Sequence, residues 1–212
     1  MTIDGGFPLA SCVVAGDIDG DGGADLLVTS GTSRALLWYK PSDDPLVQPW
    51  GRQVVDLTPG AREPVFAKLV DLNRDGRLDF VVAMGGYGNQ PGMAVWYEND
   101  GIAEGRVQWK KHSIGDIPRM TDVAIGDIDG DGAIDVVASG FMPGEIAWFR
   151  NSGNPAARWT KQIVKQDWPN VNQVIVADFD KDGRVDLAAI ADYGSMELRW
   201  WRNTGLRKNG GP

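Results

Sequence analysis

Short apolar runs, each three to six residues long, alternate with acidic, glycine-rich segments along the whole chain. An apolar run of this length between turn signals is typical of a β-strand that is buried on both faces. No segment shows the periodicity of a helix of ordinary length. Four runs precede an acidic segment (12–15, 65–70, 123–125 and 174–177) and four follow one (26–28, 80–84, 136–138 and 187–191).

Two further strands are predicted downstream of each such pair. The third carries two adjacent aromatic residues, at 38–39, 96–97, 148–149 and 200–201, and the last three pairs are followed by an Asn-x-Gly turn. Such a turn reverses the chain between antiparallel strands. A fourth strand begins at Trp50, Trp109 and Trp159, and its alternation of polar and apolar residues predicts an edge strand with one solvated face. We expect the tryptophans at these recurring positions to pack between sheets.

The acidic segments are copies of one another, with the pattern Asp-x-Asp/Asn-x-Asp-Gly-x-x-Asp. They begin at residues 17, 71, 127 and 178, so the repeat intervals are 54, 56 and 51 residues. A period of this size indicates a propeller or a solenoid. Four antiparallel strands in each repeat describe the blade of a β-propeller, so the sequence predicts an all-β fold with four blades in this chain.

Each acidic loop has the chemistry of a cation site. Side-chain oxygens at loop positions 1, 3, 5 and 9 converge when the glycine at position 6 turns the chain, and Ca²⁺ takes six to eight such oxygen ligands. Without a cation, three or four neighbouring carboxylates repel one another. The predicted side-chain ligands are Asp17, Asp19, Asp21, Asp25, Asp71, Asn73, Asp75, Asp79, Asp127, Asp129, Asp131, Asp135, Asp178, Asp180, Asp182 and Asp186. The backbone carbonyls of position 7 complete the set, at Gly23, Arg77, Ala133 and Arg184.

An EF-hand is the competing interpretation of these loops. It requires helices on both sides and a bidentate Glu at position 12. Position 12 is occupied here by Val28, Val82, Ala138 and Ala189, within the second strand of each repeat. The fourth carboxylate instead comes from position 9, so the EF-hand is excluded.

Together, the acidic loop, its flanking apolar strands and the aromatic pair resemble the FG-GAP/VCBS repeat. That repeat forms the propeller heads of integrin alpha subunits, many secreted bacterial proteins and some fungal lectins. The resemblance covers essentially the whole chain, and it implies one Ca²⁺ per blade, about four in all, in the loop between the first and second strands. It leaves the biochemical role open among adhesion modules, lectins and ancillary domains of carbohydrate-active enzymes.

The four loops differ in their own charges. Loops 1 and 3 have four Asp ligands and no basic residue, whereas loop 2 has Asn73 with two arginines, and loop 4 has Lys181 and Arg184. Because ligand charge tunes Ca²⁺ affinity, the sequence predicts the tightest sites in loops 1 and 3 and the weakest in loop 2.

We interpret residues 1–212 as one propeller domain, with repeats at about 9–57, 64–115, 120–165 and 171–205. The last repeat lacks a Trp-led fourth strand, and residues 1–8 resemble the end of one, which predicts that they complete the last blade. Three arrangements remain open: a closed four-bladed propeller, an eight-bladed ring formed by a homodimer, and a half-ring cut from a longer protein. The repeat family that the chain resembles usually has seven or eight blades, which favours the dimer and the half-ring, and of these two we expect the dimer.

The composition of the chain limits the classes of partner that we expect. A net charge of −8 with a pI near 4.6 argues against nucleic acid, and no apolar run has the ~20 residues of a membrane span. Cys12 and His112 are the only residues of their types, so no intrachain disulfide is expected and no catalytic constellation stands out. Calcium sites favour an extracellular or periplasmic location, although the first residues lack a signal peptide.

The turns after the second and fourth strands lie opposite the acidic loops and carry the least repetitive residues. Loops on a rigid scaffold often carry binding residues, and an exposed Trp suits stacking on a sugar or gripping a peptide. The candidate ligand-binding residues are Trp168, Asn170, Tyr87, Arg119 and Tyr193. Two functions remain: a binding or adhesion module for a glycan or protein, and a carbohydrate-active enzyme or its ancillary domain.

Overall fold

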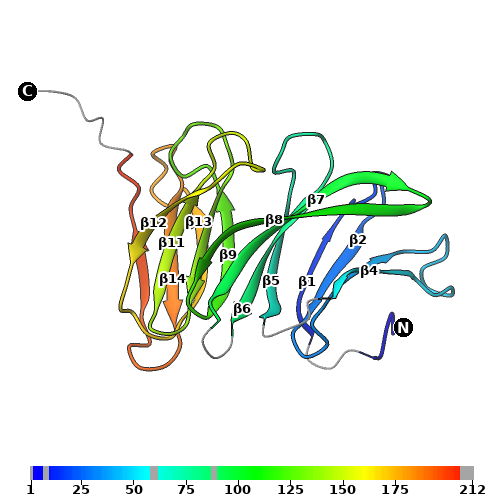
Figure 1. The fold of residues 1–212 in the computed structure, drawn as a ribbon, viewed down its shortest axis with the longest axis horizontal. Helices are drawn as coiled ribbons and strands as arrows, with labels where there is room; N and C mark the ends of the chain where they lie inside the picture. Colours follow the sequence, from blue (N-terminus) through cyan, green and yellow to red (C-terminus); the bar gives the residue numbers. More distant parts are fainter. Residues whose placement is uncertain (1, 7–9, 58–61, 87–89, 206–212) are drawn as a thin grey trace, which may run out of the picture.

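A computed structural model describes residues 2–6, 10–57, 62–86 and 90–205. Within these ranges the chain forms fifteen β-strands and no helix (Figure 1). Blade 1 contains β1 (Ala10–Gly16), β2 (Asp25–Ser30), β3 (Ala35–Lys40) and β4 (Gly51–Leu57). Blade 2 contains β5 (Arg62–Val70), β6 (Asp79–Gly86), β7 (Gly92–Ala103) and β8 (Arg106–Ile117). Blade 3 contains β9 (Met120–Gly126), β10 (Asp135–Gly140), β11 (Glu145–Arg150) and β12 (Thr160–Lys165), and blade 4 contains β13 (Val171–Ala177), β14 (Asp186–Ala191) and β15 (Leu198–Trp201).

Each blade is an antiparallel sheet whose strands pair in the order of the sequence. The first three sheets have four strands, and the described part of blade 4 has three, with β15 at the edge. The second strand is the most buried in blades 2, 3 and 4, whereas in blade 1 it is β3. The fourth strands β4 and β12 are largely exposed, as their alternating pattern predicts. The predicted all-β fold with four propeller blades is confirmed.

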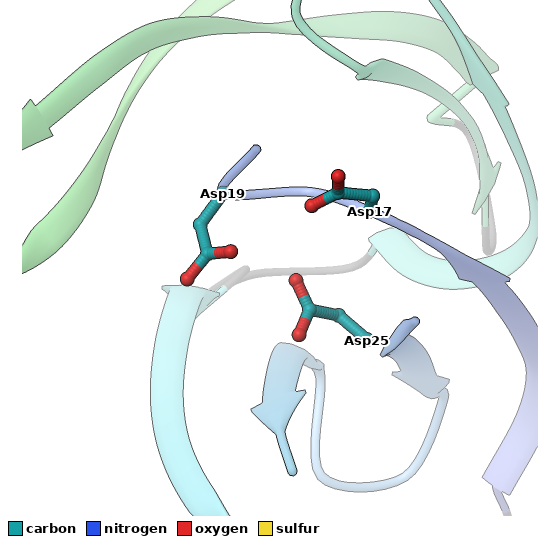
Figure 2. Close-up of side chains that lie close together, drawn as sticks. All are labelled: Asp17, Asp19 and Asp25. Atoms are coloured by element: carbon teal, nitrogen blue, oxygen red, sulfur yellow. The ribbon is translucent and has the colours of Figure 1, made fainter. Parts of the chain in front are cut away.

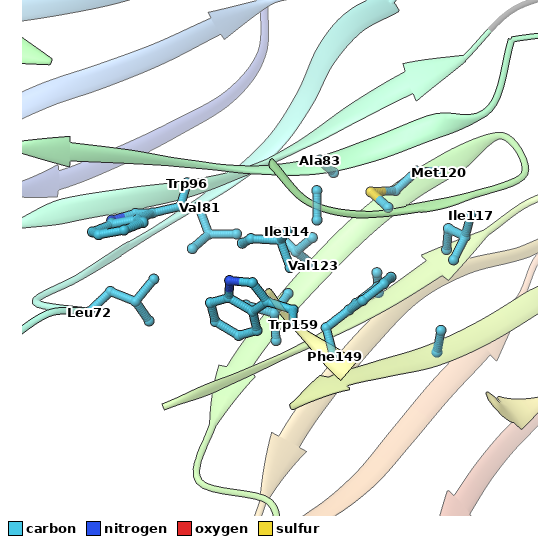
Figure 3. Close-up of a cluster of buried hydrophobic side chains, with 14 residues drawn as sticks. Leu72, Val81, Ala83, Trp96, Ile114, Ile117, Met120, Val123, Phe149 and Trp159 are labelled. Atoms are coloured by element: carbon cyan, nitrogen blue, oxygen red, sulfur yellow. The ribbon is translucent and has the colours of Figure 1, made fainter. Parts of the chain in front are cut away.

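Consecutive blades pack face to face through apolar side chains. One cluster joins blades 2 and 3: Trp96, Val81 and Leu72 lie against Val123 and Phe149 of the next blade (Figure 3). Similar clusters join blade 1 to blade 2 and blade 3 to blade 4. The aromatic pair serves both sides of a blade, because its first residue faces the following blade and its second faces the preceding one.

The blades follow one another around the propeller in chain order. The first strand of each blade packs on the first strand of the next, β1 on β5, β5 on β9 and β9 on β13. Blades 1 and 4 lie at opposite ends of the longest axis, with blades 2 and 3 between them (Figure 1). Each therefore has one sheet face without a neighbouring blade among the described residues.

Candidate metal centre

The acidic loops bring their carboxylates together at equivalent corners of the blades. In blade 1, Asp17 and Asp19 come from the β1–β2 loop and Asp25 from the start of β2, and their carboxylates face one another (Figure 2). Potential ligand oxygens of these three residues lie within 4.8 Å of one another. The same holds for the trio Asp127, Asp129 and Asp135 and for the trio Asp178, Asp180 and Asp186.

Backbone hydrogen bonds give the loop its shape. The carboxylate of Asp17 accepts from the amides of Gly20 at 2.8 Å and Gly22 at 2.9 Å. Gly22, at position 6, has a φ of 90°, a left-handed conformation that an L side chain rarely adopts. Asp21 accepts from the amide of Gly23 at 2.7 Å, which closes the second half of the turn. The loop therefore folds around its own carboxylates, each of which keeps oxygen lone pairs for a further partner.

The aspartate at position 9 is buried and ties three parts of the blade together. Asp135 accepts from Ile128 N in the loop at 3.0 Å and from Asn151 N beyond β11 at 2.8 Å. Burial raises the pKa of Asp135 to about 6, against the opposing effect of these two amides. Asp79 of blade 2 has the same pair of contacts, to Leu72 N and Asn99 N, and burial likewise raises its pKa to about 6.

Blade 1 lacks one of these contacts for a reason visible in the sequence. Pro41 stands where blades 2, 3 and 4 have the asparagine of the Asn-x-Gly turn. A proline has no backbone N–H to donate. The carboxylate of Asp25 accepts from Ile18 N at 3.1 Å, and burial raises its pKa as well.

The asparagines of the Asn-x-Gly turns also connect neighbouring blades. Asn99 donates from Nδ2 to the carbonyl of Ile18, in the acidic loop of blade 1, at 2.8 Å. Asn203 donates in the same way to Ile128 of blade 3 at 2.7 Å. The sequence predicted only turns at these residues, whereas the structure shows that two of them hold the acidic loop of the preceding blade.

A basic side chain at the end of the third strand, or directly after it, pairs with the aspartates of three of the four loops. Lys40 pairs with Asp19 and with Asp21, the latter at 2.6 Å. Arg150 pairs with Asp129 and Asp131 in blade 3, and Arg202 pairs with Asp180 and Asp182 in blade 4. Sequence reasoning missed these three residues, although all of them directly follow the aromatic pair.

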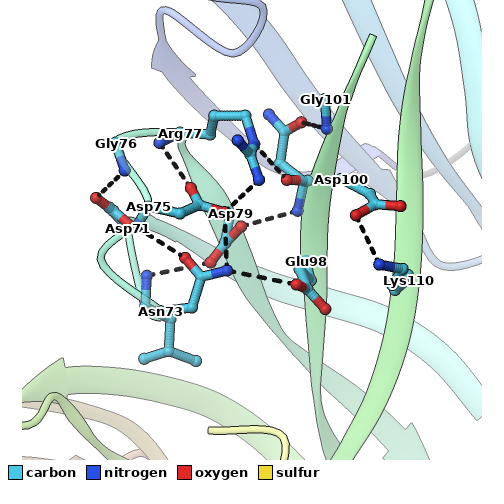
Figure 4. A network of polar contacts seen from close by, with 12 residues as sticks. Asp71, Asn73, Asp75, Gly76, Arg77, Asp79, Glu98, Asp100, Gly101 and Lys110 are labelled. Carbon is cyan, nitrogen blue, oxygen red and sulfur yellow. Dashed lines mark hydrogen bonds and ion pairs between the residues drawn. The ribbon is translucent and has the colours of Figure 1, made fainter. Parts of the chain in front are cut away.

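Blade 2 reverses this arrangement. The residue after its aromatic pair is Glu98, and loop position 3 is Asn73 (Figure 4). The amide nitrogen of Asn73 donates to Asp75 at 2.9 Å and to Glu98 at 3.4 Å. Arg77, at position 7, pairs with Asp75 and donates from Nε to the carbonyl of Asn99 at 2.7 Å. Blade 2 thus offers a glutamate where the other blades offer a cation.

The donor set of the loops fits a hard divalent cation. Three carboxylates that face a common point supply oxygen ligands, which Ca²⁺ prefers, and no described His or Cys lies among these groups. In blade 2, Glu98 adds negative charge beside Asn73. The side chains of Lys40, Arg150 and Arg202 neutralise part of this charge in their own blades.

Among the candidate ligand-binding residues, the expected exposure of Trp168 is wrong. Its side chain is 3% exposed, because it packs edge-on against Trp201 with a 5.7 Å separation of ring centroids and lies under the guanidinium of Arg199. Its indole nitrogen donates to Ser195 Oγ at 2.9 Å. Trp168 therefore packs against blade 4, which leaves its ring no free face for a sugar.

The other candidates are spread along the rim opposite the acidic loops. Asn170 holds the rim together, since its backbone amide donates to Phe141 O at 2.7 Å and its side chain donates to Tyr193 O at 2.8 Å. Tyr193 is 72% exposed. Arg119 lies over the ring of Phe141, at 5.7 Å from its centroid, in a hollow between blades 2 and 3. Tyr87 lies outside the described residues.

Cys12 and His112 have structural surroundings. His112 stacks on Trp96, with ring centroids 4.4 Å apart, and its Nε2 lies 2.8 Å from Glu98. Cys12 is half-buried, with its Sγ 4.0 Å from the carbonyl of Ala67. The described part of the chain contains no helix long and apolar enough to cross a membrane.

Comparison with known proteins agrees with the geometry of the loops. A sequence profile described as the FG-GAP-like repeat matches residues 71–138 and 128–189. These two matches cover more than half of the chain and include three of the four acidic loops. No curated protein matches the chain. The chain belongs to the FG-GAP-like repeat family.

Proposed function

We propose that this chain is a calcium-stabilised β-propeller scaffold that binds a glycan or protein ligand outside the cytosol. The proposal rests chiefly on three carboxylates converging at the same corner in blades 1, 3 and 4. Loop 2 adds a fourth site, with Asn73 and Glu98 among its oxygen donors. A protein that needs four such ions to be filled suits a compartment with abundant free Ca²⁺.

The ions would be structural. Each loop joins the first strand of a blade to the second, and two of the loops are also held by an asparagine of the next blade. An ion that binds only the folded state stabilises that state by mass action, by ~2.7 kcal/mol per site when free Ca²⁺ is a hundredfold above Kd. Calcium therefore fixes the strand ends and the blade junctions, while ligands bind elsewhere.

The rim opposite the acidic loops supports ligand binding best. A hollow there is lined by the backbone of Gly85 and Gly86 and by the side chains of Arg119, Met120 and Phe141. A guanidinium over an aromatic ring offers both hydrogen-bond donors and a flat apolar surface. Arg119 and the exposed Tyr193 are the two side chains on which we base this part of the proposal.

The metal is tested by preparing the protein with excess EGTA and measuring thermal unfolding before and after Ca²⁺ is restored. We expect Ca²⁺ to raise Tm by at least ~10 °C, since each kcal/mol shifts the Tm of a chain of this size by ~2–4 °C. Equimolar Mg²⁺ is the control, and it should give a smaller rise because it demands six ligands in a near-ideal octahedron. A protein whose Tm is the same in EGTA and in Ca²⁺ would contradict the proposal.

The ligand is tested on a glycan array and a cell-surface protein panel, with Ca²⁺ present. We expect Arg119→Ala or Tyr193→Ala to reduce binding without changing the Tm in Ca²⁺. Arg158→Ala, an exposed arginine outside this rim, is the matched control and should bind as the wild type does. If both rim variants bind like the control, the ligand site lies elsewhere and this part of the proposal fails.

A further inference from the structure

The outer face of blade 4, the face turned away from blade 3, is apolar and exposed. Trp200 is 52% exposed, whereas its counterparts Trp38, Trp96 and Trp148 in the other blades are 6%, 1% and 7% exposed. The expectation that every recurring tryptophan packs between blades is therefore wrong for Trp200. Leu198, Ile190 and Ile175 are likewise exposed on this face, and Leu198 reaches 74%. Each of these positions faces the following blade, and blade 4 has no following blade among the described residues.

The outer face of blade 1, which is turned away from blade 2, is exposed in its first and fourth strands, whereas Leu37 and Tyr39 of β3 are buried there. Val13 lies four residues before the first aspartate of its loop and is 60% exposed. The residues at this position in the other blades are Ala67, Val123 and Val174, all of which are buried against the preceding blade. Val54, which faces the same side of the sheet in β4, is also exposed.

The N-terminal residues occupy, on blade 1, the position that part of a preceding blade would occupy. Asp4 accepts a hydrogen bond from the hydroxyl of Tyr39 at 2.8 Å and lies 3.8 Å from Arg52. At the junction of blades 1 and 2, Asp56 of the fourth strand β4 accepts from Tyr97 at 2.6 Å and pairs with Lys111 at 2.8 Å.

The two sets of partners are equivalent within their blades. Tyr39 pairs with Arg52 across β3 and β4, just as Tyr97 pairs with Lys111 across β7 and β8. Asp4 thus stands on blade 1 where the fourth strand of a preceding blade would stand.

Blade 4 has three strands among the described residues. Among the described residues, β15 pairs only with β14, so its other edge presents unpaired backbone groups. An edge of this kind is a template for another strand. Figure 1 shows the N-terminal residues beside blade 1, at the opposite end of the molecule from β15, so residues 2–6 do not pair with β15 within one copy.

We propose that two copies of this chain form an eight-bladed ring with two-fold symmetry. The outer face of blade 4 in each copy packs on the outer face of blade 1 in the other. Residues 2–6 of each copy lie along β15 of the other and serve as the fourth strand of its blade 4. The three junctions within the chain show that faces of these two kinds pack tightly, and a two-fold axis closes both new junctions at once.

This inference goes beyond the proposed function, because it depends on neither calcium nor the ligand. Light scattering of the full chain in Ca²⁺ buffer should give a mass of about 46 kDa, twice the 23.0 kDa of one chain. A mass of one chain at tens of micromolar would overturn the proposal, and so would a ladder of larger oligomers, since open chains do not close a ring.

The faces are tested by Leu198→Glu, with Leu46→Glu as its matched control. Both leucines are highly exposed, at 74% and 81%, but Leu46 lies in the β3–β4 connection, outside the strands of the sheet. We expect Leu198→Glu to weaken the dimer at least ~30-fold, as burial of a charge at an apolar interface centre does. Circular dichroism should show the β-structure retained. A dimer as tight as that of the control would overturn the assignment of this face.

The N-terminal contact is tested by Asp4→Asn against Asp56→Asn. Both changes remove a carboxylate beside a tyrosine and a cation, but Asp56 acts at a junction within the chain. We expect Asp4→Asn to weaken the dimer several-fold and Asp56→Asn to leave its dissociation constant unchanged while lowering Tm. Equal dissociation constants for Asp4→Asn and the wild type would remove residues 2–6 from the interface.

Discussion

The acidic loop of blade 3 has Asp129 facing the guanidinium of Arg150, whereas the loop of blade 2 has Asn73 facing the carboxylate of Glu98. Both loops nevertheless have the same backbone pattern, with the position-9 aspartate bonded to position 2 and to an asparagine beyond the third strand. A change at loop position 3 is thus matched by a change on a strand more than twenty residues away. The net charge at each acidic corner therefore depends on the third strand of the blade as well as on the loop itself.

The acidic corners of blades 2 and 3 carry the same net charge. Four aspartates and Arg150 leave three negative charges in blade 3. Three aspartates, Glu98 and Arg77 leave the same three in blade 2. The ranking of Ca²⁺ affinities, with loop 2 weakest, stays a prediction. Glu98 should raise the affinity of the blade 2 site and Arg150 should lower that of the blade 3 site, so the expected difference in affinity is smaller.

Removal of the side chain at loop position 3 should give the largest difference in Ca²⁺ affinity between blades 2 and 3. Asp129→Ala removes a charged oxygen ligand, and Asn73→Ala removes a neutral one. A unit charge at ~4 Å with an effective dielectric constant of ~20 is worth ~4 kcal/mol, so we expect Asp129→Ala to weaken the blade 3 site at least ~100-fold. Asn73→Ala should cost ~10-fold or less. Calorimetric titration with Ca²⁺ resolves the two. Equal losses would contradict the argument from ligand charge, and no loss in either variant would show that position 3 is not a ligand.

Glu98→Gln should weaken Ca²⁺ binding in blade 2 and leave Ca²⁺ binding in blade 3 unchanged. The carboxylate of Glu98 is mostly buried and lies beside Asn73 and His112. Loss of its charge should weaken the blade 2 site by ~10-fold, since a charge of this kind is worth ~1–2 kcal/mol when part of the field is screened. Glu104→Gln, at the exposed tip of the β7–β8 hairpin, is the control and should leave the titration unchanged.

Arg150→Gln should give two smaller effects of opposite sign. In calcium-free protein, loss of the pairs to Asp129 and Asp131 should lower Tm only slightly, as expected for a partly exposed ion pair. In the titration, loss of a nearby positive charge should raise the Ca²⁺ affinity of blade 3 several-fold. Lys40→Gln should repeat both effects in blade 1. A drop in affinity would identify Arg150 as a support for the bound state.

The sequence predicted the strands, the four blades and the acidic loops, because each depends on a pattern that repeats within a few neighbouring residues. It did not predict Lys40, Arg150, Arg202 or Glu98 at the loops, because these contacts cross from one strand to another. Nor could it show that Asn99 holds Ile18, since that bond joins residues of different blades. Trp168 was wrongly expected to be exposed, because its burial depends on how blades 3 and 4 pack.

The expected difference between blades 2 and 3 is smallest at the position-9 aspartates, on which the two blades should agree. Burial raises the pKa of Asp79 and of Asp135 to about 6, above the ordinary value of 3.8 that we take for the unfolded chain. The folded protein therefore binds these protons more tightly, so their contribution favours folding at low pH and declines as the pH rises from about 4 to 6. In EGTA, Asp79→Asn and Asp135→Asn should each remove part of this decline by the same amount.

Calcium should reverse the sign of this pH dependence. Metal binding requires ionised carboxylates, so the stabilisation by Ca²⁺ grows as these groups lose their protons. Unfolding followed by calorimetry at pH 4 and pH 7, with EGTA and with Ca²⁺, gives four values of Tm for each variant. We expect the gain from Ca²⁺ to be larger at pH 7 in the wild type and to shrink equally in the two variants. Unequal losses would show that the difference between blades 2 and 3 extends from position 3 to the buried aspartate.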